Sequence, residues 1–357
     1  MAPTLRAALL GTMIAVAALG LRVIGTDPGV QAGQETLTSL YTPPANPAEA
    51  ILNQHDGQHA AALAVDPLLR DHAVFGSREE HAYRATRPLM GWLAAAASLG
   101  QDRAVPWVLL GLTAVGTGVL VAGVGTVAEV FGRRTDLSVA AIALPGAVVQ
   151  LGWAGLADNL AVGAALLGLA WWSRRRPALA AVAFCVAVLG RETTLVVPVA
   201  LVLVELARRV PWRSLLPLLA APIALAAWTC VVRLRIGVWP ASAGDARIAT
   251  PWSGLGSAFG RWEPIDVLVI AGSFLGLAVA LRRRPPPVLV AVVALSAVGS
   301  LFLGWNVWER WEDLTRVLLP ASAAALVALL PARDPIDRRW DAGRAVSADP
   351  LLGAGQR

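Results

Sequence analysis

The sequence AVPWVLLGLTAVGTGVLVAGVGTVA, which covers residues 104–128, decides the fold. It contains no charged residue, and an apolar run of about 20 residues is the length that a helix needs to cross a hydrocarbon layer of about 30 Å. Helices must carry such runs, because lipid offers no hydrogen-bond partner to an exposed backbone. Residues 104–128 therefore predict a transmembrane helix.

Apolar runs of this kind recur along the chain. Of its 357 residues, 56% are apolar and only 15% are charged, whereas charged residues make up roughly a quarter of a soluble domain. The sequence predicts an all-α, polytopic integral membrane protein with about 10–12 transmembrane helices. The other predicted spans are residues 7–24, 137–156, 159–173, 177–190, 193–207, 214–232, 266–281, 288–305 and 317–332, with a short apolar piece at 88–100.

The positions of the arginines predict the orientation in the membrane. They cluster at residues 133–134, 174–176, 208–213, 282–284 and 333–339, between the apolar runs. Such clusters are typical of cytoplasmic loops, so the net charge of +6 requires no nucleic-acid partner. The loop at 25–87 and the turns at 152–159, 190–194, 235–264 and 305–316 then face the extracytoplasmic side. Two apolar pieces, 88–100 and 104–128, separate the outside loop from Arg133, although an odd number of crossings is needed. Either residues 88–100 form a re-entrant or half-length segment, which we favour, or Arg133-Arg134 does not follow the rule.

The chain divides into two predicted parts. Residues 1–332 form a transmembrane domain, in which residues 25–87 are a large first extracytoplasmic loop with short helices. Residues 333–357 are polar and rich in Asp and Arg, and we expect them to form a disordered cytoplasmic tail. The expected location is the cell (plasma) membrane as a multi-pass protein, with the lipid bilayer as a partner and the active site on the extracytoplasmic side.

The first extracytoplasmic loop holds all four histidines and the sequence His55-Asp56-Gly57-Gln58-His59. Two histidines four residues apart resemble the zinc-binding pair of a metalloprotease helix, but Gly57 weakens such a helix and no third ligand stands out. Alternatively, the Asp56 carboxylate lies in a partly apolar cleft, where its pKa rises and it acts as a general base. A third interpretation makes Asp56 a turn or helix-capping residue only.

Several short motifs occur at the predicted extracytoplasmic ends. They are Asp56-Gly57-Gln58, Asp66-Pro67, YRATRPL at residues 83–89, Arg191-Glu192-Thr193, and Arg316 with Pro320. Together with the layout of one span, a large outside loop and many further spans, they resemble GT-C class glycosyltransferases. More narrowly, they resemble bacterial membrane proteins of cell-surface glycan formation. Two departures are His59, where an aromatic residue usually follows the Gln, and the sequence Leu156-Ala157-Asp158-Asn159 at the next outside turn.

The resemblance implies an inverting glycosyltransferase with a GT-C-like fold. Its donor would be a sugar on a polyprenyl phosphate, mannose-like or another hexose or pentose, and its acceptor an extracytoplasmic glycan or lipid of the cell envelope. Asp56 would be the catalytic base. Arg191 and Arg316 would bind the phosphate, because arginine offers a planar bidentate fork. The implied substrate-binding residues are Gly57, Gln58, Arg84, Arg87, Asp158, Arg191, Glu192 and Arg316. The cofactor stays unknown, since some GT-C enzymes use a divalent metal ion, and no metal ligand is assigned.

Simpler interpretations stay open for several of these residues. Arg84 and Arg87 can be interfacial anchors, Asp158 can satisfy its own loop, and Arg316 can belong to a surface ion-pair network with the acidic residues before it. Two other functions also stay open. A transporter or flippase for lipid-linked envelope glycans would use the same arginines without a base, and a non-catalytic subunit of a glycan-assembly complex would need neither.

Overall fold

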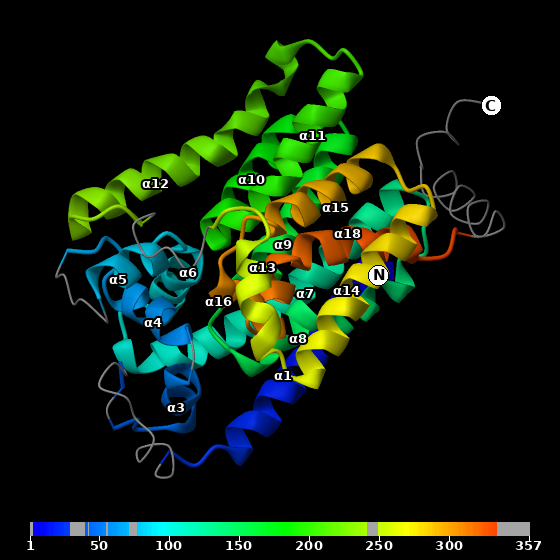
Figure 1. The fold of residues 1–357 in the computed structure, drawn as a ribbon. Coiled ribbons are helices and arrows are strands. Elements are labelled where there is room, and N and C mark those ends of the chain that lie inside the picture. The colour runs from blue at the N-terminus through cyan, green and yellow to red at the C-terminus, as the bar shows by residue number, and fades with distance from the viewer. Residues whose placement is uncertain are drawn as a thin grey trace, which may run out of the picture.

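The computed structural model describes residues 3–28, 40–41, 43–54, 56–70, 77–240 and 249–333. Within these ranges the regular structure is helical, apart from one isolated β-bridge between Arg133 and Ala332 (Figure 1). The prediction of an all-α fold is therefore confirmed for the described part of the chain.

Four helical stretches are long and apolar enough to cross a membrane. Each of them coincides with a predicted span, at residues 7–24, 104–128, 214–232 and 266–281. They are α1 (Pro3–Gly25), the stretch Asp102–Val130 formed by η1 (Asp102–Ala104) and α7 (Val105–Val130), the stretch Trp212–Ile236 formed by η4 (Trp212–Leu219) and α12 (Ala220–Ile236), and α14 (Pro264–Arg282).

The other predicted spans correspond to shorter helices. Each is shorter than the roughly 20 residues of a straight span. They are α9 (Asp158–Ser173), α10 (Pro177–Gly190), η3 (Glu192–Leu195) with α11 (Val196–Ala207), α15 (Pro287–Ser300) and α18 (Leu319–Leu329). The apolar piece at 88–100 forms α6 (Leu89–Ser98), which has only 10 residues. The half-length assignment stays a prediction, because α18, at a predicted full span, has only 11 residues.

The predicted span at 137–156 is divided into two helices. Residues Asp136–Ala143 form η2, and α8 covers Pro145–Gly152. Leu144 between them is extended, with ψ 131°. A proline disfavours the helical conformation of the residue before it, so Pro145 ends one helix and begins the next.

The interior of the bundle depends on close contact between α7 and α9. A Cβ added at Gly163 would lie 2.5 Å from the carbonyl carbon of Val119, and one at Gly123 would lie 2.6 Å from the carbonyl oxygen of Gly163. Only glycine permits backbones to approach this closely, as is common where helices pack in membranes. Residues of α10 and α18 complete the same core, among them Phe184, Ala187 and Ala324.

The two ends of the bundle differ in the residues they gather. At one end, Arg174 pairs with Glu129 at 2.8 Å, and the backbone N–H of Arg333 donates to the carbonyl of Gly132 at 2.9 Å. These arginines come from the clusters predicted to be cytoplasmic. The predicted tail beyond Arg333 lies outside the described residues.

At the other end lie the short helices of the first loop. They are α3 (Pro47–Asn53), α4 (Gly57–Val65) and α5 (Arg78–Ala85); in Figure 1, α4 and α5 lie next to α6, and α3 lies below α4. The end of α12 extends to α5, where the Trp228 ring N–H donates to the carbonyl of Ala85 at 2.7 Å. α16 (Trp305–Trp308) and α17 (Trp311–Val317) lead into α18. Segments that the sequence predicts on the extracytoplasmic side therefore lie at the same end of the helix bundle.

Candidate active site

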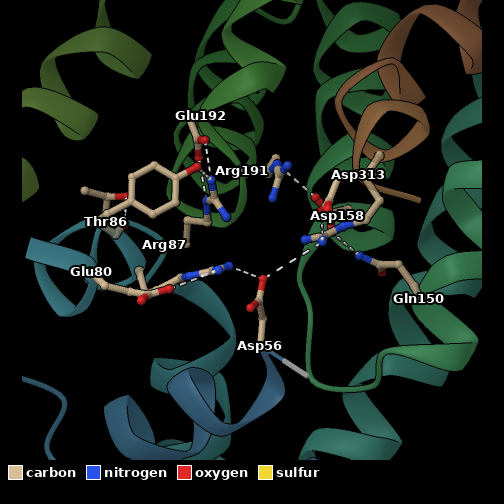
Figure 2. Close-up of polar contacts among 12 residues, drawn as sticks. Asp56, Glu80, Thr86, Arg87, Gln150, Asp158, Arg191, Glu192 and Asp313 are labelled. Carbon is tan, nitrogen blue, oxygen red and sulfur yellow. Dashed lines mark hydrogen bonds and ion pairs between the residues drawn. The ribbon is translucent and has the colours of Figure 1, made fainter. Parts of the chain in front are cut away.

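Asp56 immediately precedes α4 and projects its carboxylate away from that helix. Gly57 fixes this position, because a Cβ there would collide with the carbonyl oxygen of Ala154 and would lie 2.7 Å from Leu52. The Asp56 side chain makes no capping hydrogen bond. It instead pairs with Arg84 of α5 and lies 3.9 Å from Arg316 of α17 (Figure 2). The interpretation of Asp56 as a capping residue only is therefore wrong.

Asp158 forms the centre of a buried ionic cluster. Its side chain is 2% exposed and bridges two guanidinium groups, with Oδ1 3.0 Å from Nε of Arg191 and Oδ2 3.1 Å from Nε of Arg316. Arg191 lies between α10 and α11, and Arg316 lies just before α18, so three distant segments meet here. Arg316 is only 2% exposed, which rules out the alternative of a surface ion-pair network. Its guanidinium also lies 5.1 Å from the Trp153 ring centre.

Arg191 has spare hydrogen-bonding capacity. The residue is 7% exposed and lines the same pocket as Asp56. Among the described residues its guanidinium pairs with Asp158 alone, so its two terminal nitrogens have no hydrogen-bond partner there. A buried guanidinium with unused donors is costly unless an anion or water completes it. This arrangement suits an anionic ligand.

Arg87 and Glu192 form a second pair at the pocket. Nε and Nη2 of Arg87 donate to the two carboxylate oxygens of Glu192 at 2.7 and 2.5 Å. Nη2 also donates to the Tyr83 hydroxyl at 2.5 Å, and the guanidinium lies 4.7 Å from the centre of that ring. A bidentate pair of this kind joins the first loop to the turn after α10. It therefore holds the loop over the site, in addition to any contact with a substrate.

A pocket of about 40 Å³ opens between these groups. A space of this size holds a few water molecules. Its wall combines the ionic residues with apolar ones, so fixed charges would hold an anionic group that enters the pocket. The lining residues are Asp56, His59, Ala60, Leu63, Arg84, Arg87, Met90, Gly155, Leu156, Ala157, Asp158, Gly190, Arg191 and Arg316.

The charge state of Asp56 differs from the sequence-based expectation. Burial of the carboxyl by itself raises the pKa of Asp56, but the charges of Arg84 and Arg316 lower it more. The result is a pKa well below the ordinary range of aspartate, so the expected raised pKa is wrong. The pKa of Asp313 is instead raised. Burial of its carboxyl raises this pKa most, the charge of Arg316 lowers it, and the charge of Asp56 raises it further.

The predicted catalytic and substrate-binding residues did not include three contributors to the site. Gln150 donates to Asp158 at 2.6 Å, His59 lines the pocket, and Asp313 lies 3.4 Å from Arg316. Gln150 had a usable signal, since its amide is the most polar side chain inside the predicted span 137–156, and strongly polar residues in spans tend to be functional. The predicted Gln58 lies elsewhere: its side-chain oxygen accepts from the backbone N–H of Leu40 at 3.3 Å.

The described residues do not fit a metal centre. They contain no group of three or more His, Cys, Asp or Glu side chains placed to hold a metal ion. The carboxylates of Asp56 and Asp158 are already paired with arginines. For the zinc alternative, His55 lies outside the described residues, and α4 begins only at Gly57.

The site can bind an anion and accept a proton at adjoining positions. Arg191 and Arg316 supply the positive charge, and the Asp56 carboxylate, 3.9 Å from Arg316, is a group that can accept a proton. The chain matches no protein-family model, and neither a curated protein nor a solved structure is significantly similar to it.

Proposed function

We propose that the protein is a polytopic membrane glycosyltransferase that transfers a sugar from a polyprenyl-phosphate donor to an extracytoplasmic glycan or lipid acceptor of the cell envelope. The observation that carries this proposal is the meeting of Asp56, Arg191 and Arg316 in one pocket. Transfer of a sugar from a sugar phosphate requires a base next to an anion-binding site. The four membrane-length helices support a location in the cell membrane.

The arginines account for the phosphate of the donor. Asp158 is shared by two guanidinium groups, so the pair of Arg191 and Arg316 carries one positive charge more than their common partner. A phosphate that leaves the anomeric carbon develops negative charge, and guanidinium donors held in fixed positions stabilise such charge without reorganisation. The unused terminal donors of Arg191 match this role.

An apolar groove near the site supports a lipid-linked donor. It has a volume of about 330 Å³ and is lined by residues of α14 and α18 and by the start of α8. Gly146 of α8 packs against the backbone of Thr315, next to Arg316. Ser322, the first α18 residue that lines the groove, follows Arg316 by six residues along the chain. A lipid phosphate held by Arg316 would therefore have apolar surface within reach of its chain.

Asp56 acts as the base in the proposed reaction. The acceptor hydroxyl oxygen forms a bond to the anomeric carbon, the bond from that carbon to the phosphate oxygen breaks, and the hydroxyl proton passes to Asp56. The products are the inverted glycoside and the polyprenyl phosphate. A carboxylate with a lowered pKa suffices, because the attacking oxygen becomes strongly acidic as its bond forms to an oxocarbenium-like carbon. The same lowered pKa returns the proton readily to water.

The test is envelope glycan composition in a host that lacks the gene. The deletion strain is complemented with the wild type, with Asp56→Asn, or with Asp136→Asn at matched expression. Asp136 is a suitable control because it also pairs with an arginine, but at an exposed position. We expect the wild type and Asp136→Asn to restore a missing sugar, and Asp56→Asn to fail, because Asn keeps the size of Asp and removes its basicity.

Equal restoration by Asp56→Asn and the wild type would overturn the base assignment. A transporter, a flippase or a non-catalytic subunit of glycan assembly would then explain the phenotype better, since none of these needs a base. An unchanged glycan in the deletion strain would remove the proposed role in the envelope altogether.

A further inference from the structure

Gln150 makes two different hydrogen bonds from one buried amide. It lies on α8, is 1% exposed, and donates from Nε2 to Oδ2 of Asp158 at 2.6 Å. Its Oε1 accepts from the backbone N–H of Asn159 at 2.9 Å. A carboxylate can only accept and a backbone N–H can only donate, so only this orientation of the amide satisfies both partners.

The two bonds have different consequences. The bond to Asn159 satisfies a backbone N–H in the first turn of α9, which has no partner within the helix. The bond to Asp158 restrains the carboxylate that bridges Arg191 and Arg316 (Figure 2). Because the amide is neutral, it holds the carboxylate without changing the charge of the cluster.

We propose that Gln150 is a positioning residue of the phosphate site. Its Nε2–H group holds Asp158 so that Arg191 and Arg316 are spaced to receive one phosphate group together. This inference rests on the proposed function, because the ligand is the phosphate of a polyprenyl phosphate. A residue that only caps α9 would need the oxygen of the amide, whereas a positioning residue needs the nitrogen.

The variant Gln150→Glu separates these two roles. It has nearly the same shape and keeps an oxygen that accepts from Asn159, but it replaces the amide nitrogen with a second oxygen. When protonated, the new carboxyl still donates to Asp158. When ionised, it repels Asp158 instead. Protonation of the new carboxyl therefore restores the hydrogen bond to Asp158 and ionisation removes it, so binding by this variant should weaken as the pH rises.

Several charged groups surround position 150 and stay the same in all variants. They are Asp158 of α9, Arg191 before α11, Arg316 and Asp313 of α17, and Arg22 of α1, which donates to the carbonyl of Leu151 at 3.3 Å. Their titration, and that of the lipid phosphate, affects wild type and variant alike. Dividing the affinity of the variant by that of the wild type at each pH isolates the new carboxyl.

The measurement is the dissociation constant of undecaprenyl phosphate for the full-length protein in nanodiscs, by native mass spectrometry at about pH 5 and about pH 8. We expect Gln150→Glu to bind within about twofold of the wild type at the lower pH and about tenfold more weakly at the higher pH. Gln150→Met, which has similar length but no hydrogen bond, should bind about tenfold more weakly at both. Undecaprenol and inorganic phosphate, offered separately, distinguish binding of the lipid from binding of the phosphate.

A pH-independent affinity of Gln150→Glu close to that of the wild type would overturn the proposal, because an ionised glutamate still caps α9. If Gln150→Glu does not fold, Gln150→Met carries the test, and wild-type affinity in that variant would also overturn it. Failure of the proposed function looks different: the wild type would not bind undecaprenyl phosphate, or Arg191→Gln would bind it as tightly as the wild type.

Discussion

Replacement of Asp158 by asparagine tests whether this carboxylate holds two buried positive charges. Asp158 is 2% exposed, and both of its arginine contacts are close to 3 Å. Removal of one partner from a buried ion pair leaves an uncompensated charge and costs about 3–5 kcal/mol. The matched control is Asp136→Asn, because Asp136 pairs with Arg134 while its side chain is 52% exposed. An exposed pair contributes about 0–1 kcal/mol.

The assay is thermal unfolding of both variants in the same detergent. We expect Asp158→Asn to lower the midpoint by at least about 5 °C and Asp136→Asn by no more than about 2 °C. Sodium phosphate should stabilise Asp158→Asn more than sodium chloride at equal ionic strength, because the anion replaces the lost carboxylate between Arg191 and Arg316. Equal unfolding midpoints for the two variants would refute the reasoning. The buried ion pairs of Asp158 would then contribute no more to stability than the exposed pair of Asp136.

Two further predictions concern the first loop. Gly57→Ala should destabilise the protein by about 1–3 kcal/mol and reduce function, because the new methyl group meets backbone atoms that cannot move aside. Gly111→Ala, at a position with open space, is the control for both thermal unfolding and complementation. Arg84→Gln should reduce the lowering of the Asp56 pKa. Because the pKa of Asp56 is lower in the folded protein than in the unfolded chain, its ionised form stabilises the folded protein. This stabilisation is present above the ordinary aspartate pKa of about 3.9 and is lost as the pH falls through the pKa of the folded protein. This variant should therefore lose less stability than the wild type between neutral and acidic pH, as measured by its unfolding midpoints.

The sequence was most informative where length and composition alone determine structure. The apolar run at residues 104–128 predicted α7, and the runs at 7–24 and 266–281 predicted α1 and α14. Predicting one helix over 137–156 failed because the run contains no charged residue, and only the effect of Pro145 on Leu144 divides it. That effect is local and was readable from the sequence.

The site was predictable in its members but not in its pairings. Positive-inside reasoning placed Asp158, Arg191 and Arg316 on one side, and the structure brings them together. Which carboxylate pairs with which arginine depends on helix packing between residues far apart in the chain. The prediction for the pKa of Asp56 was wrong for the same reason. The sequence indicated that the carboxyl is buried, but it did not show that Arg84 lies beside it.

The balance of charges connects stability with function at this site. Arg84 is matched by Asp56 and Arg87 by Glu192, whereas Arg191 and Arg316 share Asp158. Asp313 lies near Arg316 on the more exposed side, so the least compensated group is Arg191. A buried guanidinium in this state destabilises the empty site, and a bound anion removes that cost. The position where the fold is least satisfied is therefore the position where an anionic ligand gains most on binding.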